Sequence, residues 1–520
     1  MLYTEVLPMM TWRRKQLSNS TPVMDDPVAT EETLTAELSQ NEAFVKQAFQ
    51  RCSDLVCRKI NDQDGTLRQL IVYLETLTDD KKVSEQLVKP LAADPQNRAA
   101  VETETWEGES MPVDKKVVTS RWSEVIRLVL RGHAAVFTEG EDQAVCFAVN
   151  AVIQRSIQEP SSEQVIRGGK EGFIERQSVN VGLLRNYLRT PRLKMEAFSV
   201  GELTETKVLV AYIEGLADVA VIDQVRNKIA SIQIDGVLES GTIEELIVDD
   251  PFPIFPHVQI TERPDVVAGS LLEGRVAILV DNTPFVMIVP TTFWAGLQAS
   301  EDYNLNSPVA TFTRWVRFIF LFVAIFAPSF FVAVTSYHQE MIPTSLLLSI
   351  ASAREPVPFP VMIEAIIMEI MFEALREAGI RLPRAIGQTV SIVGGLVIGQ
   401  AAVLAGIISA PILIVVSTTG IAAFLIPRFN FANGVRLLRF PIILLAGSLG
   451  LYGMALGFLG ILLYVVHLKS FGVPYFTPVA PFSFRAFKDV WVRAPRNNGS
   501  GLSVPSYERA VKAPQQEGGE

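Results

Sequence analysis

Residues 385–427 decide the fold, and they read AIGQTVSIVGGLVIGQAAVLAGIISAPILIVVSTTGIAAFLIP, without a charge. An α-helix rises about 1.5 Å per residue, so this stretch can form roughly 64 Å of helix. The apolar core of a bilayer is about 30 Å thick and is crossed by about 20 residues. We therefore predict two crossings, separated at Ser409-Ala410-Pro411, because proline suits the first turn of a helix and disrupts its interior.

Two further uncharged stretches flank this one, residues 318–337 and residues 440–466. Each is long enough for one crossing, which gives four predicted spans. The whole chain agrees with this prediction, because 49% of its 520 residues are hydrophobic and its mean hydropathy is +0.27. The surface of a soluble protein must be polar, so a soluble chain rarely has a positive mean hydropathy.

A fifth region is interrupted. Residues 341–353 are uncharged, residues 354–360 contain three prolines, and residues 361–375 are apolar apart from Glu364, Glu369 and Glu373. Irregular backbone is not tolerated against lipid, so we expect a broken or re-entrant element that is buried in protein or lines water. The helical domain is therefore predicted over residues 316–468, with four to six spans.

Basic residues near the ends of spans do not settle the topology. Arg314 and Arg317 place the start of the first span inside, and the basic tail after Val466 also indicates inside, which requires an even number of crossings. Four spans with a re-entrant element satisfy this requirement but leave six arginines outside, namely Arg376, Arg381, Arg384, Arg428, Arg436 and Arg439. Five crossings place these arginines inside but put the basic tail outside.

The first part of the chain predicts an α/β region of two subdomains. Short apolar runs alternate with amphipathic stretches. Residues 67–74 predict a strand, residues 134–137 and 144–149 predict a strand pair around Glu139-Gly140-Glu141-Asp142, and residues 218–229 predict an amphipathic helix. Residues 275–280 and 285–289 flank Asp281-Asn282-Thr283-Pro284, a hairpin signal. The predicted organisation is a disordered polar lead (1–40), two cytosolic α/β subdomains (41–165 and 166–315) and, after the helical domain, a polar and basic tail (469–520). No signal peptide precedes the first span, so we expect the α/β region to be cytoplasmic.

Several functional classes are disfavoured. The net charge of −10 does not favour a nucleic-acid partner, and Cys52, Cys57 and Cys146 have no metal-ligand or disulfide spacing. The segment RGGKEG at 167–172 lacks the first glycine and the Ser/Thr of a phosphate loop, and predicts a tight turn with Arg167 or Lys170 in a local ion pair. We expect no enzyme activity, catalytic residue, metal or cofactor.

Small residues recur at a spacing of four in the predicted membrane helix, which places them on one face. They are Gly387, Ser391, Gly395 and Gly399, with Val403 next in register, and Gln388 and Gln400 lie in the same helix. Such a face lets helices approach closely in lipid, either within one subunit or around a symmetric pore. Each glutamine is expected either to bond a neighbouring helix or to line the pore.

Carboxylates mark the segment that precedes this helix. Glu369, Glu373 and Glu377 are also four apart, and like charges at that spacing repel. We expect Arg376, Arg381 or contact with water to offset this repulsion. One interpretation is a helix in the membrane interface with a wet acidic face. The other is a gate or acidic ring for cations, formed by Glu364, Glu369 and Glu373.

Several long stretches resemble one family, the A subunits of GerA-type spore germinant receptors. They include YIEGLAD (212–218), IDGVLESGTIEELI (234–247), HQEMIPTSLLLSIASAREPVPFP (338–360) and RLLRFP (436–441), within a collinear match over roughly residues 65–480. The sequence departs from the family pattern at Gly169, Lys170, Thr242 and Leu404; the last stands where glutamate is common.

The resemblance implies a multi-pass subunit of a receptor in the spore inner membrane. Its implied partners are a permease-like B subunit, a lipoprotein C subunit, membrane lipid and further copies of itself, with a pentamer expected. It also implies a ligand-gated channel that releases cations when nutrients start germination. Two alternatives stay open, a secondary transporter built on the Pro-broken element and a non-conducting scaffold of the complex.

Overall fold

The computed structural model describes residues 32–61, 67–93, 116–151, 159–160, 162–163, 165, 167–381, 397, 399–482, 487 and 490–493. Within these residues the chain divides into two compact units. The first comprises residues up to 150 except 49–55 and 75–77, and the second comprises those two short segments and everything from residue 151 onward.

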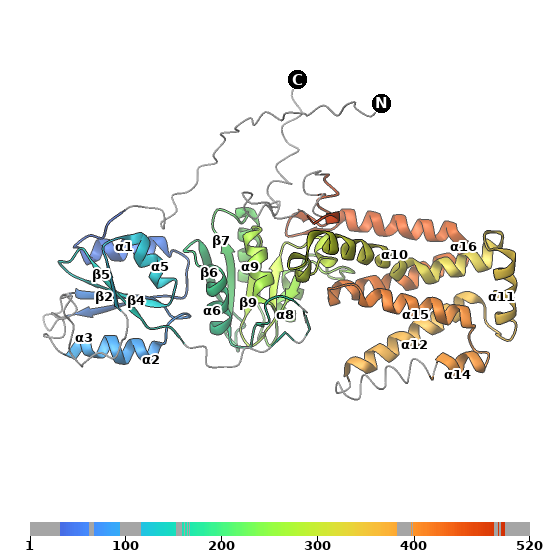
Figure 1. Cartoon of the computed structure of the whole chain (residues 1–520), viewed down its shortest axis with the longest axis horizontal. Helices are drawn as coiled ribbons and strands as arrows, with labels where there is room; N and C mark the ends of the chain where they lie inside the picture. Colours follow the sequence, from blue (N-terminus) through green and yellow to red (C-terminus); the bar gives the residue numbers. More distant parts are fainter. Residues whose placement is uncertain are drawn as a thin grey trace, which may run out of the picture. The chain divides into compact units, whose positions relative to one another are not determined.

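The first unit is built on an antiparallel sheet covered by helices (Figure 1). Its strand order is β1-β2-β4-β5-β3. The strands are β1 (Leu55–Asn61), β2 (Leu67–Leu74), β3 (Lys116–Thr119), β4 (His133–Thr138) and β5 (Ala144–Ala148). Helices α1 (Leu38–Ala48) and α5 (Trp122–Val129) pack on one face. The other face packs on a run of short helices, α2 (Asp80–Lys82), η1 (Val83–Val88) and α3 (Lys89–Ala93).

The predicted strands of this unit are confirmed. Residues 67–74 form β2, and the segments around Glu139-Gly140-Glu141-Asp142 form the antiparallel pair β4 and β5. Both faces of β2 are covered, which explains its nearly continuous apolar sequence. Part of the predicted polar lead belongs to this unit, since Leu34 is buried and α1 begins at Leu38. Residues 1–31 lie outside the described residues.

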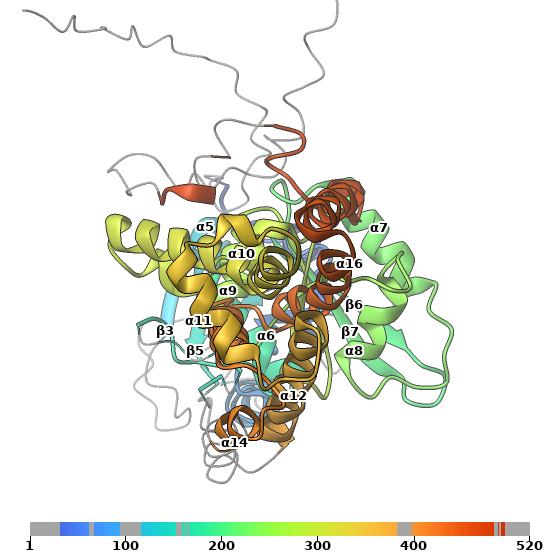
Figure 2. The same cartoon turned by 90° about the vertical axis from the view of Figure 1, so that its right-hand side faces the viewer.

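The second unit contains another five-stranded sheet, with order β6-β7-β9-β10-β8 and antiparallel neighbours. Its strands are β6 (Leu193–Val200), β7 (Thr206–Ile213), β8 (Gln259–Thr261), β9 (Val276–Val280) and β10 (Val286–Val289). Helices α7 (Val219–Ala230) and α8 (Ser240–Ile247) cover one face, and α6 (Gln177–Tyr187) and α9 (Pro264–Leu272) cover the other (Figure 2). The predicted hairpin of β9 and β10 and the predicted helix over 218–229 are confirmed, and the structure shows Asp218 as the N-cap of α7.

The helical region follows short turns η2 (Phe293–Gly296) and η3 (Ser300–Tyr303). Its helices are α10 (Ser307–Tyr337), α11 (Thr344–Arg354), α12 (Val361–Arg381), α14 (Gly399–Leu404), α15 (Ala410–Phe424) and α16 (Phe429–His467), with a short turn η4 (Gln339–Met341). The predicted break is confirmed, because Ser409 is the N-cap of α15 and Pro411 lies in its first turn. By length and composition, two helices of the described part, α10 and α16, could each cross a membrane, so the four to six predicted spans are not established by hydropathy.

The prediction of one span over residues 440–466 is wrong, because α16 reverses at Gly450. This glycine has φ 62° and ψ −142°, a conformation that residues with a Cβ rarely adopt. A Cβ placed on Gly457 would lie 3.4 Å from Cγ1 of Ile442, although a continuous helix would separate these residues by about 22 Å. The helix therefore consists of two antiparallel arms, 429–449 and 451–467.

The predicted broken element is two separate helices, and α12 runs the length of the bundle. At its start Met362 packs on Gly447, near the end of the first α16 arm. At its other end the Arg376 guanidinium lies 6.0 Å from the ring of Phe429, at the start of that arm. Helix α11 lies at the far end of the bundle, between the end of α10 and the start of α12 (Figure 1).

Candidate functional site

The predicted pore segment is described only in its last part. Gly387, Gln388, Ser391 and Gly395 lie outside the described residues, whereas Gly399, Gln400 and Val403 lie in α14, which begins at Gly399. Gly399 is buried, and a Cβ there would meet Cδ1 of Leu413 on α15 at 3.1 Å. Its small size therefore permits packing within one subunit.

The two sides of α14 differ. Ala402 and Val403 are partly buried and pack against a cluster that includes Ile412 and Val416 of α15. Gln400 and Leu404 are exposed, the latter with 80% of its surface accessible. The side of α14 that carries the Gln400 amide is therefore not covered by the described residues.

Glu364, the first residue of the predicted gate, is completely buried. Its Oε2 accepts the backbone N–H of Ser409 at 3.0 Å, and its Oε1 accepts Nε of Arg354 at 3.2 Å. Ser409 precedes the first turn of α15, where unpaired N–H groups and the helix dipole favour an anion. This carboxylate therefore connects the starts of α12 and α15 to the end of α11.

The other two predicted gate residues are also paired. Glu369 is 3% exposed and accepts Nη1 of Arg439 at 3.0 Å, while Nη2 of Arg439 donates to the Thr419 carbonyl at 3.3 Å. Glu373 forms an ion pair with Arg376 one turn along α12. The sequence identified Arg376 as a neutralising residue but missed Arg439, because 70 positions separate it from its partner.

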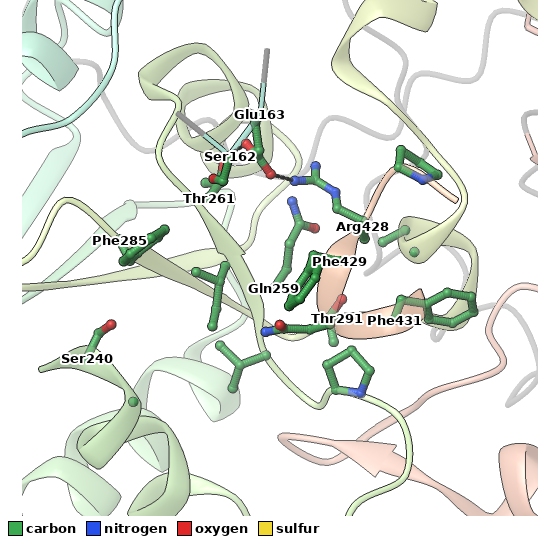
Figure 3. Close-up of a pocket in the computed structure, with 18 of the residues that line it drawn as sticks. Ser162, Glu163, Ser240, Gln259, Thr261, Phe285, Thr291, Arg428, Phe429 and Phe431 are labelled. Atoms are coloured by element: carbon green, nitrogen blue, oxygen red, sulfur yellow. Dashed lines mark hydrogen bonds and ion pairs between the residues drawn. The ribbon is translucent and has the colours of Figure 1, made fainter. Parts of the chain in front are cut away.

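Sequence reasoning also missed a cavity of about 350 Å³, which lies between β8 with its following loops and the turn that joins α15 to α16 (Figure 3). Its apolar walls include Phe285, Phe429 and Phe431, and its polar groups include Gln259 and Arg428. The signal available in the sequence was the single arginine of Pro427-Arg428-Phe429, between two apolar stretches.

An ion pair between Arg428 and Glu163 closes one side of the cavity (Figure 3). Nη1 of Arg428 donates to Oε1 of Glu163, and the other oxygen of Glu163 accepts the Thr261 hydroxyl at 2.5 Å. Both charged side chains are mostly buried, at 15% and 17% exposed. The pair joins residues 265 positions apart and fixes the α15–α16 turn to the segment before α6.

The turn at residues 167–172 carries no ligand chemistry in the described residues. As predicted, one of its basic residues forms an ion pair, because Nζ of Lys170 lies 2.8 Å from Oε1 of Glu159. Both side chains are more than half exposed, so this pair contributes little to stability. The three cysteines are free thiols.

Two β-sheets, each covered by helices, are followed by a bundle of long apolar helices. This architecture defines a protein with a membrane-type helical region. A sequence model of the family described as "Bacillus/Clostridium GerA spore germination protein" matches residues 43–500, so this chain belongs to the GerA family. The resemblance to germinant-receptor A subunits is thereby confirmed.

Two relatives from Bacillus subtilis (strain 168) match most of this chain. The chain is 46% identical over 462 residues to "Uncharacterized membrane protein YfkQ" of Bacillus subtilis (strain 168), covering 89% of this chain and 90% of that protein. It is 42% identical over 466 residues to "Spore germination protein KA" of the same organism, covering 89% and 85%. A similar solved structure is that of the N-terminal domain of the A subunit of the Bacillus megaterium spore germinant receptor GerK3, with 29% identity, coverage of 51% of this chain and 98% of that chain, and a TM-score of 0.38.

Proposed function

We propose that this chain is the A subunit of a nutrient germinant receptor in the spore inner membrane and that several copies form a ligand-gated cation channel. The observation that carries the proposal is the exposed Gln400 on α14. An amide that faces lipid lacks hydrogen-bond partners, which is costly. A second copy of the chain or a water-filled axis would supply those partners.

The course of the helices supports a multi-pass membrane region. Helix α10 leads away from the second sheet and α12 leads back, since its two ends pack against the two ends of the first α16 arm. Residue 406 is again at the far end, where a Cβ on Gly406 would lie 3.1 Å from the Pro356 carbonyl oxygen. Helix α15 returns, and the two arms of α16 lead out and back. We therefore propose six passes: α10, α12, the return from residue 381 to residue 406 at the far end, α15 and the two arms of α16.

Six passes place the C-terminal tail on the same side as the α/β region. The tail begins with the small strands β11 (Lys469–Ser470) and β12 (Val473–Pro474). The Ser470 hydroxyl donates to the His257 carbonyl at 2.7 Å and accepts the Thr291 N–H at 3.1 Å. An even number of passes is needed to bring residue 470 back to this domain, in agreement with a cytoplasmic α/β region.

The partners proposed for the subunit are a permease-like B subunit and a lipoprotein C subunit, together with lipid and other copies of the chain in a pentamer. Similar proteins are named spore germination proteins KA, B1 and A1 of Bacillus subtilis (strain 168), which supports a place in a germination complex.

Cation flux through liposomes that contain the purified oligomer tests the channel. Gln400→Leu is expected to change conductance or selectivity while leaving the abundance of the protein and its partners unchanged. Ser448→Ala is the control, because Ser448 is exposed elsewhere in the bundle and its hydroxyl, the group removed, donates to the Leu444 and Leu445 carbonyls of its own helix. The channel is refuted if oligomers carry no cation current in any germinant state.

The same measurements distinguish the two alternatives. A secondary transporter would accumulate substrate in a fixed stoichiometry as a monomer, without a sustained current. A scaffold would carry neither, and its loss would remove the partner subunits together with it.

A further inference from the structure

We propose that the cavity between the second sheet and the α15–α16 turn binds a small molecule with a carboxylate and an apolar body, and that Arg428 holds the carboxylate (Figure 3). The proposal concerns binding only, so it stands or falls independently of conduction. The volume of the cavity, about 350 Å³, lies within the range of small-molecule sites. Such sites combine mostly apolar walls with a few polar groups that orient the ligand.

The guanidinium of Arg428 has N–H donors that no described residue accepts. A guanidinium presents five N–H donors in a rigid fork that matches both oxygens of a carboxylate. Among the described residues, only Nη1 donates to a protein acceptor, Oε1 of Glu163, and the second oxygen of Glu163 accepts the Thr261 hydroxyl. Nε of Arg428 is buried without a hydrogen-bond partner among the described residues. A second carboxylate could therefore bind the fork more completely than Glu163 does.

Gln259 supplies a further donor beside Arg428. Its Oε1 accepts Nη1 of Arg275 at 3.2 Å, so its amide nitrogen is the group left to donate, and that nitrogen has no partner in the described part of the chain. The side chain projects toward the space between Thr261 and Phe429 (Figure 3). Both Gln259 and Arg428 also line a neighbouring cavity of about 250 Å³, so they stand at the boundary of two hollow regions.

The remaining walls select an apolar body. Rings of Phe285, Phe429 and Phe431 and of Tyr475 line the cavity, and burial of apolar surface against them stabilises a bound ring or branched chain. Two acidic residues line the cavity: Glu163 is already paired with Arg428, and Glu239 accepts the hydroxyls of Ser240 and Thr283 at 3.0 and 2.7 Å. A ligand carboxylate must therefore compete with Glu163, and binding would weaken the connection between residues 159–163 and the α15–α16 turn.

Calorimetric titration of the full chain in nanodiscs of zwitterionic phosphatidylcholine tests this proposal with benzoate and its uncharged isostere benzamide, each at up to about 10 mM. We expect saturable binding of benzoate and at least tenfold weaker binding of benzamide. Arg428→Gln should weaken benzoate binding at least tenfold. Arg381→Gln is the matched control and should bind benzoate normally, because Arg381 is exposed and pairs with Glu377 on α12.

Glu163→Gln makes the test independent of misfolding. It removes the competing carboxylate, so benzoate should bind several-fold more tightly, a gain that a damaged fold does not produce. The proposal is overturned if benzoate gives no saturable heat, if benzamide binds equally well, or if Glu163→Gln weakens binding. It is also overturned if anionic phosphatidylglycerol in the nanodisc abolishes the benzoate signal, because the site would then hold a lipid headgroup.

Discussion

The buried pair of Glu369 and Arg439 gives the sharpest test of how α12 is used. Glu369→Gln removes the charge of a carboxylate that is 3% exposed and leaves Arg439, which is 2% exposed, without its counter-ion. If the pair is structural, this change should destabilise the helical region. If Glu369 instead lines a cation path, the change should alter conduction and leave stability nearly intact.

The magnitude follows from the burial of both partners. Removal of one member of a buried ion pair costs about 3–5 kcal/mol, because the other charge remains desolvated. The Thr419 carbonyl keeps one bond to Arg439, so we expect a loss near the lower limit of that range. Replacing both members by apolar residues, as in Glu369→Leu with Arg439→Met, should recover most of the loss, since no buried charge is left.

Thermal or denaturant unfolding of the purified protein in detergent measures these differences. The matched control is Glu377→Gln, the same chemical change two turns further along α12, where the pair with Arg381 is 53% and 78% exposed. That variant should lose less than about 1 kcal/mol. A Glu369→Gln variant as stable as this control, or a double variant worse than the sum of its single changes, would refute the structural assignment.

Three further predictions concern other parts of the chain. Asp54→Asn should cost about 3 kcal/mol in urea unfolding, because the Asp54 carboxylate binds the completely buried Arg185 through both oxygens, at 2.8 and 3.0 Å. Burial opposes ionisation of Glu196, yet hydrogen bonds from Arg226 and Tyr212 hold its pKa below the ordinary 4.5. The stabilisation from this carboxylate is therefore present above pH 4.5 and lost as the pH falls through the lower folded-state pKa, and acid titration of Glu196→Gln should show a shallower loss. Gly450→Ala should lower stability by about 1–3 kcal/mol in thermal unfolding, while Gly460→Ala, where a Cβ meets nothing within 4 Å, should not.

Much of the α/β region could be predicted because its signals are local. Two apolar runs around Asp281-Asn282-Thr283-Pro284 give a hairpin, and Asp218 before an amphipathic stretch gives a capped helix. The break at Pro411 is local for the same reason. Shorter or less regular elements, such as the three-residue strand β8, carry no comparable period and depend on the sheet that receives them.

The reversal at Gly450 and the cavity could not be predicted in this way. Many glycines occur in apolar helices, and only the packing of Ile442 against Gly457 shows which one breaks the helix. The cavity depends on the pair of Glu163 and Arg428. In the sequence, Glu163 precedes all the strands of the second sheet and Arg428 follows them. Neither residue has a spacing motif, because tertiary contacts alone bring them together.

The proposed six-pass topology also removes the conflict over basic residues. The topology with four spans and a re-entrant element left Arg376 outside, but its guanidinium lies beside Phe429 at the start of α16, as does that of Arg436. Arg428 is fixed to Glu163, and Arg314, at the start of α10, lies over the ring of Tyr303. These arginines therefore share the end of the bundle that adjoins the second sheet.

At the opposite end, Arg354 is the basic residue at the close of α11, and it is paired with Glu364. Because short loops on the cytoplasmic side carry the excess of lysine and arginine, this distribution agrees with the proposed six passes and the proposed cytoplasmic α/β region. The conflict arose from treating α12 as re-entrant. With α12 as the complete pass proposed above, the basic residues and an even number of crossings agree.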